Sequence, residues 1–183
     1  LTSIWGSKIE GKVRDCFVHG QTRMIVTSDR LSAFDVVLTT IPFKGQLLTQ
    51  LASYWFDLTK HIIPNHVLAN PHPNVLVCQE ASVLPIEVIV RGYITGSAWR
   101  DYQAGRAVSG IKLPAGLKRS EKLAKPLITP STKAERGKHD QPISAQEIVD
   151  QEIVSPDIWR EVEEKAIELY KFGAKKSLER GLI

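Results

Sequence analysis

Residues 84–97 constrain this chain more than any other part of its sequence. The first half of this stretch, up to Val90, is a run rich in Ile and Val that is typical of a buried strand. The run ends in Arg91 and Gly92, and Gly96 and Ser97 follow. Arginine offers a planar fork of donors and glycine lets backbone N–H groups come close to a ligand, so one interpretation is an anion site. The other is a strand, a turn and a helix N-cap with a solvated Arg91.

The composition indicates an ordinary globular protein with small-molecule ligands. Of the 183 residues, 43% are hydrophobic and 24% are charged, and no apolar run approaches the roughly 18 residues of a membrane span. The sequence shows no signal-peptide pattern, and Cys16 and Cys78 are expected to be free buried thiols, so we expect a cytoplasmic location without membrane association. A net charge of +4 is mild and favours small polyanionic substrates over a nucleic-acid polymer.

The first 40 residues combine predicted strands with two polar segments. Residues 7–28 alternate in polarity and predict two or three strands, interrupted at Gly11. With Lys12 and Arg14 beside that glycine, the turn could cover nucleotide phosphates, although a plain hairpin with solvated basic residues is the favoured reading. Residues 28–35 are rich in aspartate, serine and arginine. We expect a fixed polar loop there, anchored by apolar residues.

The next segment predicts a helix over residues 44–61. Its apolar residues recur at spacings of three and four, which predicts that they pack in the core. These residues are Leu47, Leu48, Leu51, Trp55 and Leu58. Residues 70–74 predict a rigid turn before a further strand. Several strands, one helix and hairpin-length connections favour an α+β fold built on an antiparallel sheet.

The second half of the chain alternates between irregular and helical predictions. A short helix is expected from Ser97 to Ala104, and prolines and glycines make residues 110–142 irregular. Within that segment, an active-site loop over residues 129–135 is favoured over a solvated basic linker. Ser144 begins a capping-box pattern, and a final helix is predicted to begin after Ser155.

Five blocks of the sequence, in order, resemble the SAICAR synthetase family of phosphoribosylaminoimidazole-succinocarboxamide synthases. They are residues 11–15, 28–35, 63–66, 84–97 and 129–135. The resemblance implies an N-terminal lobe of antiparallel strands with one helix, over residues 1–83, similar to the small lobe of protein kinases. It implies a second α+β lobe over residues 84–183, incomplete at its C-terminal end, and ATP between the two lobes.

The resemblance also implies a reaction of purine biosynthesis. Family members join L-aspartate to the carboxylate of 5-amino-1-(5-phosphoribosyl)imidazole-4-carboxylate, split ATP to ADP and phosphate, and require Mg²⁺. A carboxylate is a poor electrophile, so phosphorylation to an acyl phosphate is expected to come first. The expected partners are therefore small molecules. The sequence does not predict whether the chain forms a homo-oligomer. The alternatives are a kinase-like ATP-binding module without ligase activity and a basic nucleic-acid-binding domain.

The resemblance implies roles for the residues of this chain that match the family's motifs. The residues expected to bind ATP are Gly11, Lys12, Val13, Arg14, Leu84 and Glu87. The residues expected to bind substrate are Arg91, Ser97, Gly96, Arg30, Ser32 and Asp140. The residues expected to act in catalysis are Lys133, Asp29 and Asp35.

A second family signature, which carries the acidic Mg²⁺ ligands, would begin after Ile183. No metal ligand is therefore expected within this chain, and the 183-residue form is expected to be inactive alone.

Overall fold

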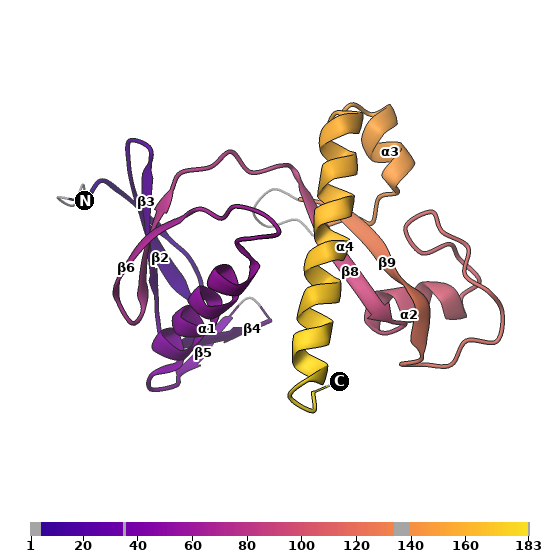
Figure 1. The fold of residues 1–183 in the computed structure, drawn as a ribbon, viewed down its shortest axis with the longest axis horizontal. Coiled ribbons are helices and arrows are strands. Elements are labelled where there is room, and N and C mark those ends of the chain that lie inside the picture. Colours follow the sequence, from indigo (N-terminus) through magenta and orange to yellow (C-terminus); the bar gives the residue numbers. More distant parts are fainter. Residues whose placement is uncertain (1–4, 35, 134–139, 183) are drawn as a thin grey trace. The chain divides into compact units, whose positions relative to one another are not determined.

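The computed structural model describes residues 5–34, 36–133 and 140–182 (Figure 1). The chain divides into two compact units, Leu1–Ser82 and Val83–Ile183. Every pairing between the strands of the described residues is antiparallel, which confirms the α+β class predicted from the sequence. No helix in the described part of the chain is long and apolar enough to cross a membrane.

The first unit is built on a five-stranded antiparallel sheet with the strand order β1-β2-β3-β7-β6. The strands of this sheet are β1 (Ser7–Glu10), β2 (Arg14–His19), β3 (Thr22–Thr27), β6 (Val67–His72) and β7 (Val75–Gln79). A separate two-stranded ribbon and one helix complete the unit. These are β4 (Arg30–Ala33), β5 (Val36–Thr40) and α1 (Lys44–Thr59).

The buried face of this sheet carries the two cysteines. Cys16 on β2 and Cys78 on β7 are both free and buried, as expected from the sequence. Burial raises the pKa of the Cys78 thiol. Arg23 on β3 lies opposite Cys78 and donates two hydrogen bonds of 2.6 Å to the Glu80 carboxylate. This bidentate ion pair ties the middle strand of the sheet to the end of β7.

Helix α1 packs through its small residues, so the prediction that its apolar stripe lies in the core is wrong for Leu47, Leu48 and Leu51, whereas Trp55 and Leu58 are half-buried. Leu47 and Leu51 are 67% and 50% exposed, whereas Gly45 and Thr49 are buried. The Thr49 hydroxyl donates to the Thr27 hydroxyl at 3.0 Å, and a Cβ at Gly45 would lie 2.4 Å from the carbonyl oxygen of Thr27. The helix therefore approaches β3 so closely that only small residues fit at the contact.

The second unit combines two long antiparallel strands with three helices. The elements are β8 (Ile86–Tyr93), α2 (Gly96–Gln103), β9 (Lys122–Thr132), α3 (Ala145–Asp150) and α4 (Pro156–Leu178). The long helix α4 runs alongside the two strands (Figure 1). The buried core lies where the strands, α3 and α4 meet. It consists of Ile86, Ile143, Ile148, Val154 and Trp159.

Strand β9 corrects the prediction of an irregular segment over residues 110–142. Residues 122–132 form a continuous strand although Pro126 and Pro130 lie within it. Proline cannot donate to a ladder, and β9 pairs only with β8 among the strands that the structure describes. Pro71 lies in β6, which is likewise an edge strand, so residues 70–72 belong to a strand and not to the rigid turn predicted over residues 70–74.

Ser144 forms the capping box predicted at the start of α3. Its hydroxyl accepts a hydrogen bond from the Glu147 N–H at 3.2 Å, and the Glu147 carboxylate accepts one from the Ser144 N–H at 2.8 Å. We expect Ser144→Ala to destabilise this region by about 1 kcal/mol, measured as faster hydrogen exchange at the Ile148 amide. Ser155→Ala is the matched control, because its single capping bond to Ile158 is long, at 3.5 Å, and should cost less. Equal effects of the two variants would contradict the prediction.

The Arg23–Glu80 pair predicts an acid-sensitive contribution to stability. Hydrogen bonding from Arg23 lowers the pKa of Glu80 below its ordinary value. A lowered folded-state pKa stabilises the fold above the unfolded value of about 4.3 and loses that effect as the pH falls through the lowered pKa. We therefore expect Glu80→Gln to lower the thermal midpoint at pH 7 and to differ little from the wild type in strong acid. A difference that does not change with pH would contradict this cause.

Candidate functional site

One face of β8 lines a cavity of about 250 Å³ in the second unit. Glu87, Ile89 and Arg91 alternate along the strand and all border this cavity, whereas Ile86 and Val88 face the core. Successive side chains of a strand point to opposite faces, so this alternation separates the polar site from the packed side. The strand that sequence analysis read as buried therefore has one face in the core and one face that lines the cavity.

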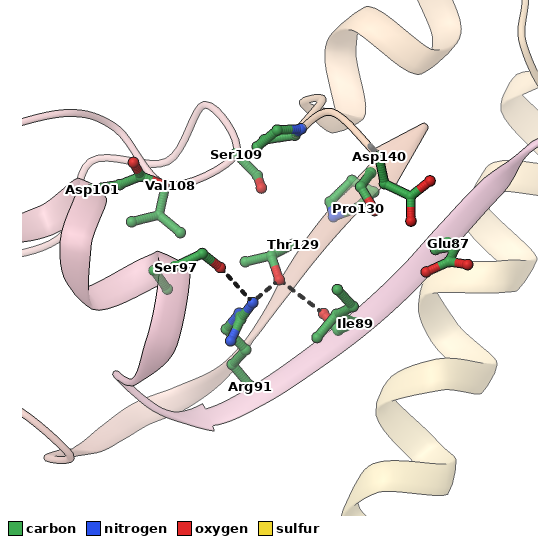
Figure 2. Close-up of a pocket in the computed structure, with 13 residues that line it drawn as sticks. Glu87, Ile89, Arg91, Ser97, Asp101, Val108, Ser109, Thr129, Pro130 and Asp140 are labelled. Atoms are coloured by element: carbon green, nitrogen blue, oxygen red, sulfur yellow. Dashed lines mark hydrogen bonds between the residues drawn. The ribbon is translucent and has the colours of Figure 1, made fainter. Parts of the chain in front are cut away.

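The guanidinium of Arg91 is held by hydroxyl groups from two other elements (Figure 2). Its Nε donates to the Thr129 Oγ1 on β9 at 3.0 Å, and its Nη2 donates to the Ser97 Oγ on α2 at 3.1 Å. The Thr129 hydroxyl in turn donates to the carbonyl oxygen of Ile89 at 3.3 Å, and only 5% of Thr129 is exposed. This chain of bonds fixes the direction in which the guanidinium faces the cavity.

The first turn of α2 brings backbone donors to the same cavity. Ser97 and Ala98 line the cavity, and the N-cap residue Thr95 makes no side-chain capping bond to this turn. The first N–H groups of a helix have no partner within the helix and carry a partial positive charge. Gly96 has a φ of 56°, in the left-handed region that glycine adopts without strain. Arg91 and the beginning of α2 together form a site suited to an anion with several oxygens.

Two of the three lining carboxylates lie in a different part of the cavity. Glu87 and Asp140 both line it, and Figure 2 shows them on the side away from Arg91 and Ser97. Arg91 lies four positions after Glu87 along an extended strand, which corresponds to roughly 13 Å. A third lining carboxylate, that of Asp101, accepts a hydrogen bond of 2.6 Å from Arg106. The cavity therefore suits a ligand that is anionic at one end and carries hydrogen-bond donors at the other.

Three predicted site residues of this unit, Gly96, Lys133 and Leu84, lie outside the lining of the cavity. Lys133 is exposed just after β9, and its backbone N–H donates to the carbonyl oxygen of Pro85 at 3.0 Å. Leu84 precedes β8 and is 36% exposed. The predicted loop over residues 129–135 is partly wrong, since residues 129–132 belong to β9 and residues 134–135 lie outside the described residues.

In the first unit, residues 11–14 form the turn between β1 and β2. The Gly11 N–H donates to the carbonyl oxygen of Arg14 at 2.9 Å, and a Cβ at Gly11 would lie 2.7 Å from that same oxygen. The turn thus has room only for glycine at this position. Lys12 and Arg14 are exposed, and Val13 is half-buried. Two basic side chains on a tight turn can approach a polyanion.

The polar segment that follows β3 binds other parts of the first unit. The Asp29 carboxylate accepts hydrogen bonds from the backbone N–H groups of Phe43 at 3.2 Å and Gly45 at 2.9 Å. Arg30 donates to the β1–β2 turn, and Ser32 is half-buried in β4. Phe34 is 97% exposed with a φ of 51°, so the expectation that it anchors this segment is wrong. Asp35 lies outside the described residues.

Sequence analysis placed Thr129 in the predicted active-site loop but did not predict its hydrogen bond with Arg91. The signal that could have found it is register: Thr129 lies opposite Ile89, on the strand face that Arg91 shares. That register depends on recognising β9 as a strand despite its prolines. Among the described residues, no group of three or more His, Cys, Asp or Glu side chains is arranged to hold a metal ion.

Comparisons with known proteins place this geometry in one family. The family model described as SAICAR synthetase matches residues 7–183. The phosphoribosylaminoimidazole-succinocarboxamide synthase of Bacteroides thetaiotaomicron is 46% identical over 180 residues, which cover 97% of this chain and 57% of that protein. The enzyme of the same name from Methylobacillus flagellatus is 44% identical over 190 residues, with 95% and 63% covered.

Solved structures agree with the sequence relatives. The SAICAR synthase of Saccharomyces cerevisiae, solved in complex with SAICAR, superposes with a TM-score of 0.85 at 35% identity and covers 98% of this chain and 66% of that one. A type-2 SAICAR synthetase in complex with ADP gives a TM-score of 0.76 at 24% identity, with 95% and 69% covered, and shares the fold. The chain thus spans somewhat over half the length of the curated relatives that it matches. It belongs to the SAICAR synthetase family.

Proposed function

We propose that this chain provides part of an ATP-dependent carbon–nitrogen ligase of purine biosynthesis. The reaction joins the amino group of L-aspartate to the carboxylate of 5-amino-1-(5-phosphoribosyl)imidazole-4-carboxylate and gives SAICAR, while ATP becomes ADP and phosphate. The observation that carries the proposal is the guanidinium of Arg91, oriented beside Ser97 at the N-terminus of α2. Support comes from the relatives that bear this enzyme's name and from the related synthase solved with SAICAR.

The cavity of the second unit is the proposed site for the imidazole nucleotide. Its 5′-phosphate would bind Arg91, Ser97 and the backbone donors beside Gly96, because a phosphate accepts several charge-assisted hydrogen bonds at once. The sugar and the base would then extend along β8 toward Glu87 and Asp140, whose carboxylates can accept hydrogen bonds from hydroxyl and amino groups. This orientation places the end of the substrate that reacts away from Arg91.

Separate ATP-binding roles are proposed for the turn of the first unit and for residues of the second unit. The turn over residues 11–14 would cover the phosphates with Lys12 and Arg14, and the backbone near Leu84 would contact the adenine. Lys133 would lie near the transferred phosphoryl group. Support for nucleotide use comes from the related fold solved with ADP. The Mg²⁺ that such phosphoryl transfer uses would neutralise phosphate charge, and no residue of this chain is assigned to hold it.

The chemistry follows from the weakness of a carboxylate as an electrophile. A carboxylate oxygen attacks the γ-phosphorus of ATP, the bond to ADP breaks, and an acyl phosphate forms. The amine of L-aspartate then attacks the acyl carbon, phosphate leaves with the bonding pair, and the amine loses a proton. Phosphoryl transfer of this kind depends mainly on positioning and on neutralising charge, so the basic residues named above are the expected contributors.

Arg91→Ala tests the proposed phosphate site. The loss of charged hydrogen bonds worth roughly 1.5–3 kcal/mol each should weaken binding of the imidazole nucleotide about 10- to 100-fold, while ATP affinity stays unchanged. The measurement is calorimetric titration of the chain expressed at the full length of its reading frame. Arg100→Ala is the control, because Arg100 is an exposed arginine on the same helix α2 and does not line the cavity.

Unchanged nucleotide affinity in Arg91→Ala would contradict the phosphate assignment. ATP binding that is indifferent to the imidazole nucleotide would favour the kinase-like module instead.

Thr129→Val tests the support of Arg91. Valine keeps the shape of the side chain but removes the hydroxyl that accepts from the Arg91 Nε, so we expect several-fold weaker binding of the imidazole nucleotide. Thr129→Ser keeps the hydroxyl and should restore most of the affinity. If the valine and serine variants bind equally well, the hydrogen bond to Thr129 does not orient Arg91.

A further inference from the structure

We propose that Arg30 is a positioning residue that holds the β1–β2 turn in the shape needed to bind phosphate oxygens through its backbone. The inference rests on the proposed binding of ATP phosphates at residues 11–14. The family resemblance led us to expect direct substrate contact for Arg30. The geometry points to a different role, because the guanidinium is directed at the turn itself.

The guanidinium of Arg30 binds two consecutive carbonyl groups of the turn. Its Nε donates to the carbonyl oxygen of Lys12 and its Nη2 donates to that of Gly11, each at 3.0 Å. The same Nη2 donates to the Asp15 carboxylate at 2.7 Å. One planar edge of the guanidinium thus binds three acceptors, an arrangement that the point charge of a lysine cannot reproduce.

Ser28 holds the third carbonyl of the same turn. Both its backbone N–H, at 3.0 Å, and its hydroxyl, at 2.8 Å, donate to the carbonyl oxygen of Val13. The Ser28 hydroxyl also accepts from the Arg30 N–H at 3.4 Å. The carbonyl groups of three successive residues, 11, 12 and 13, are therefore all bound by residues 28–30, which we call the clasp.

The clasp has a consequence for the N–H groups of the turn. In a trans peptide the C=O and the N–H of one peptide unit point in opposite directions, and the described residues contain no cis peptide bond. Because the carbonyls of Gly11 and Lys12 point toward Arg30, the N–H groups of Lys12 and Val13 point to the opposite side. Successive N–H groups that point to one side of a turn form a concave site for an anion.

The clasp also balances the negative charge of the Asp15 carboxylate near the turn. A hydrogen bond from Arg30 lowers the pKa of Asp15, so this carboxylate is ionised at neutral pH. Arg30, at 2.7 Å, and Lys8, at 3.3 Å, balance its charge. Without Arg30, an incompletely balanced carboxylate next to the turn would repel phosphate.

Asp29, the middle residue of the clasp, binds the beginning of α1. Its carboxylate accepts from Phe43 and Gly45, and its carbonyl oxygen accepts from Ile41 at 2.9 Å. The Lys44 ammonium adds a bond of 3.1 Å to the carbonyl oxygen of Arg30. The turn is therefore held against a folded helix and not against a loose loop, which gives Arg30 a fixed base.

Arg30→Lys tests the role of Arg30 in the chain expressed at the full length of its reading frame. Without ligand, we expect hydrogen exchange at the Gly11 amide to become about tenfold faster. ATP affinity, measured by calorimetry, should fall about tenfold, while affinity for the imidazole nucleotide is unchanged. Asp15→Asn is the matched control, since it leaves both carbonyl bonds of Arg30 in place and should change exchange much less.

The outcomes separate this inference from the proposed function. Arg30→Lys with exchange and ATP affinity like the wild type overturns the positioning role. A loss of ATP affinity with unchanged exchange also overturns it and indicates direct contact with the ligand. If the wild type does not bind ATP but exchange at the Gly11 amide is faster in Arg30→Lys, Arg30 does position the turn. That result refutes only ATP as the ligand of the turn. If Arg30→Lys does not fold, Ser28→Ala decides by the same two measurements, because it removes one of the two bonds to Val13.

Discussion

The hydrogen bond between the buried hydroxyl of Thr129 and the guanidinium of Arg91 is the interaction on which the candidate site depends. It joins β8 to β9 on the cavity face, and the bond from Arg91 to Ser97 then adds α2. One residue further on, the other face of β8 meets α4, where a Cβ at Gly92 would lie 1.7 Å from the Tyr170 hydroxyl oxygen. The end of β8 is thus fixed from both faces, and Arg91 projects from a rigid position.

In the first unit, hydrogen bonds fix the orientation of backbone groups instead of a side chain. Its turn over residues 11–14 has its carbonyl groups bound by Ser28 and Arg30, while Asp29 binds the beginning of α1. In both units an arginine is oriented by neighbouring oxygen atoms. We propose that Arg91 itself binds an anion, whereas Arg30 orients the turn that binds one. This difference explains why two arginines in two polar motifs have different proposed roles.

Local patterns in the sequence predicted the parts of the fold that local chemistry controls. The capping box at Ser144, the start of α4 at Ser155 and the placement of Arg91 and Ser97 around one cavity all involve residues close together in the chain. The prediction failed where contacts with residues distant in the sequence determine the local structure. Pro130 is tolerated in β9 because, among the described residues, β8 is the only strand that pairs with β9 and its other side carries only the isolated bridge between Ser131 and Pro142, a property of the sheet that the local sequence does not contain.

The predictions for the packing of α1 and for the role of Thr129 failed for the same reason: both depend on contacts with residues distant in the sequence. The leucine stripe predicted a core helix, but Gly45 and Thr49 form the actual contact because β3 approaches them closely. The position of Thr129 beside Arg91 could be identified only after its register with Ile89 was known.

A crystal structure with the imidazole carboxylate nucleotide bound would test the central claim most directly. Our account predicts the 5′-phosphate within hydrogen-bonding distance, about 3 Å, of the Arg91 guanidinium and the Ser97 hydroxyl, with the base directed toward Glu87. A phosphate bound elsewhere, with the bonds of Arg91 to Thr129 and Ser97 unchanged and its guanidinium in solvent, would contradict it.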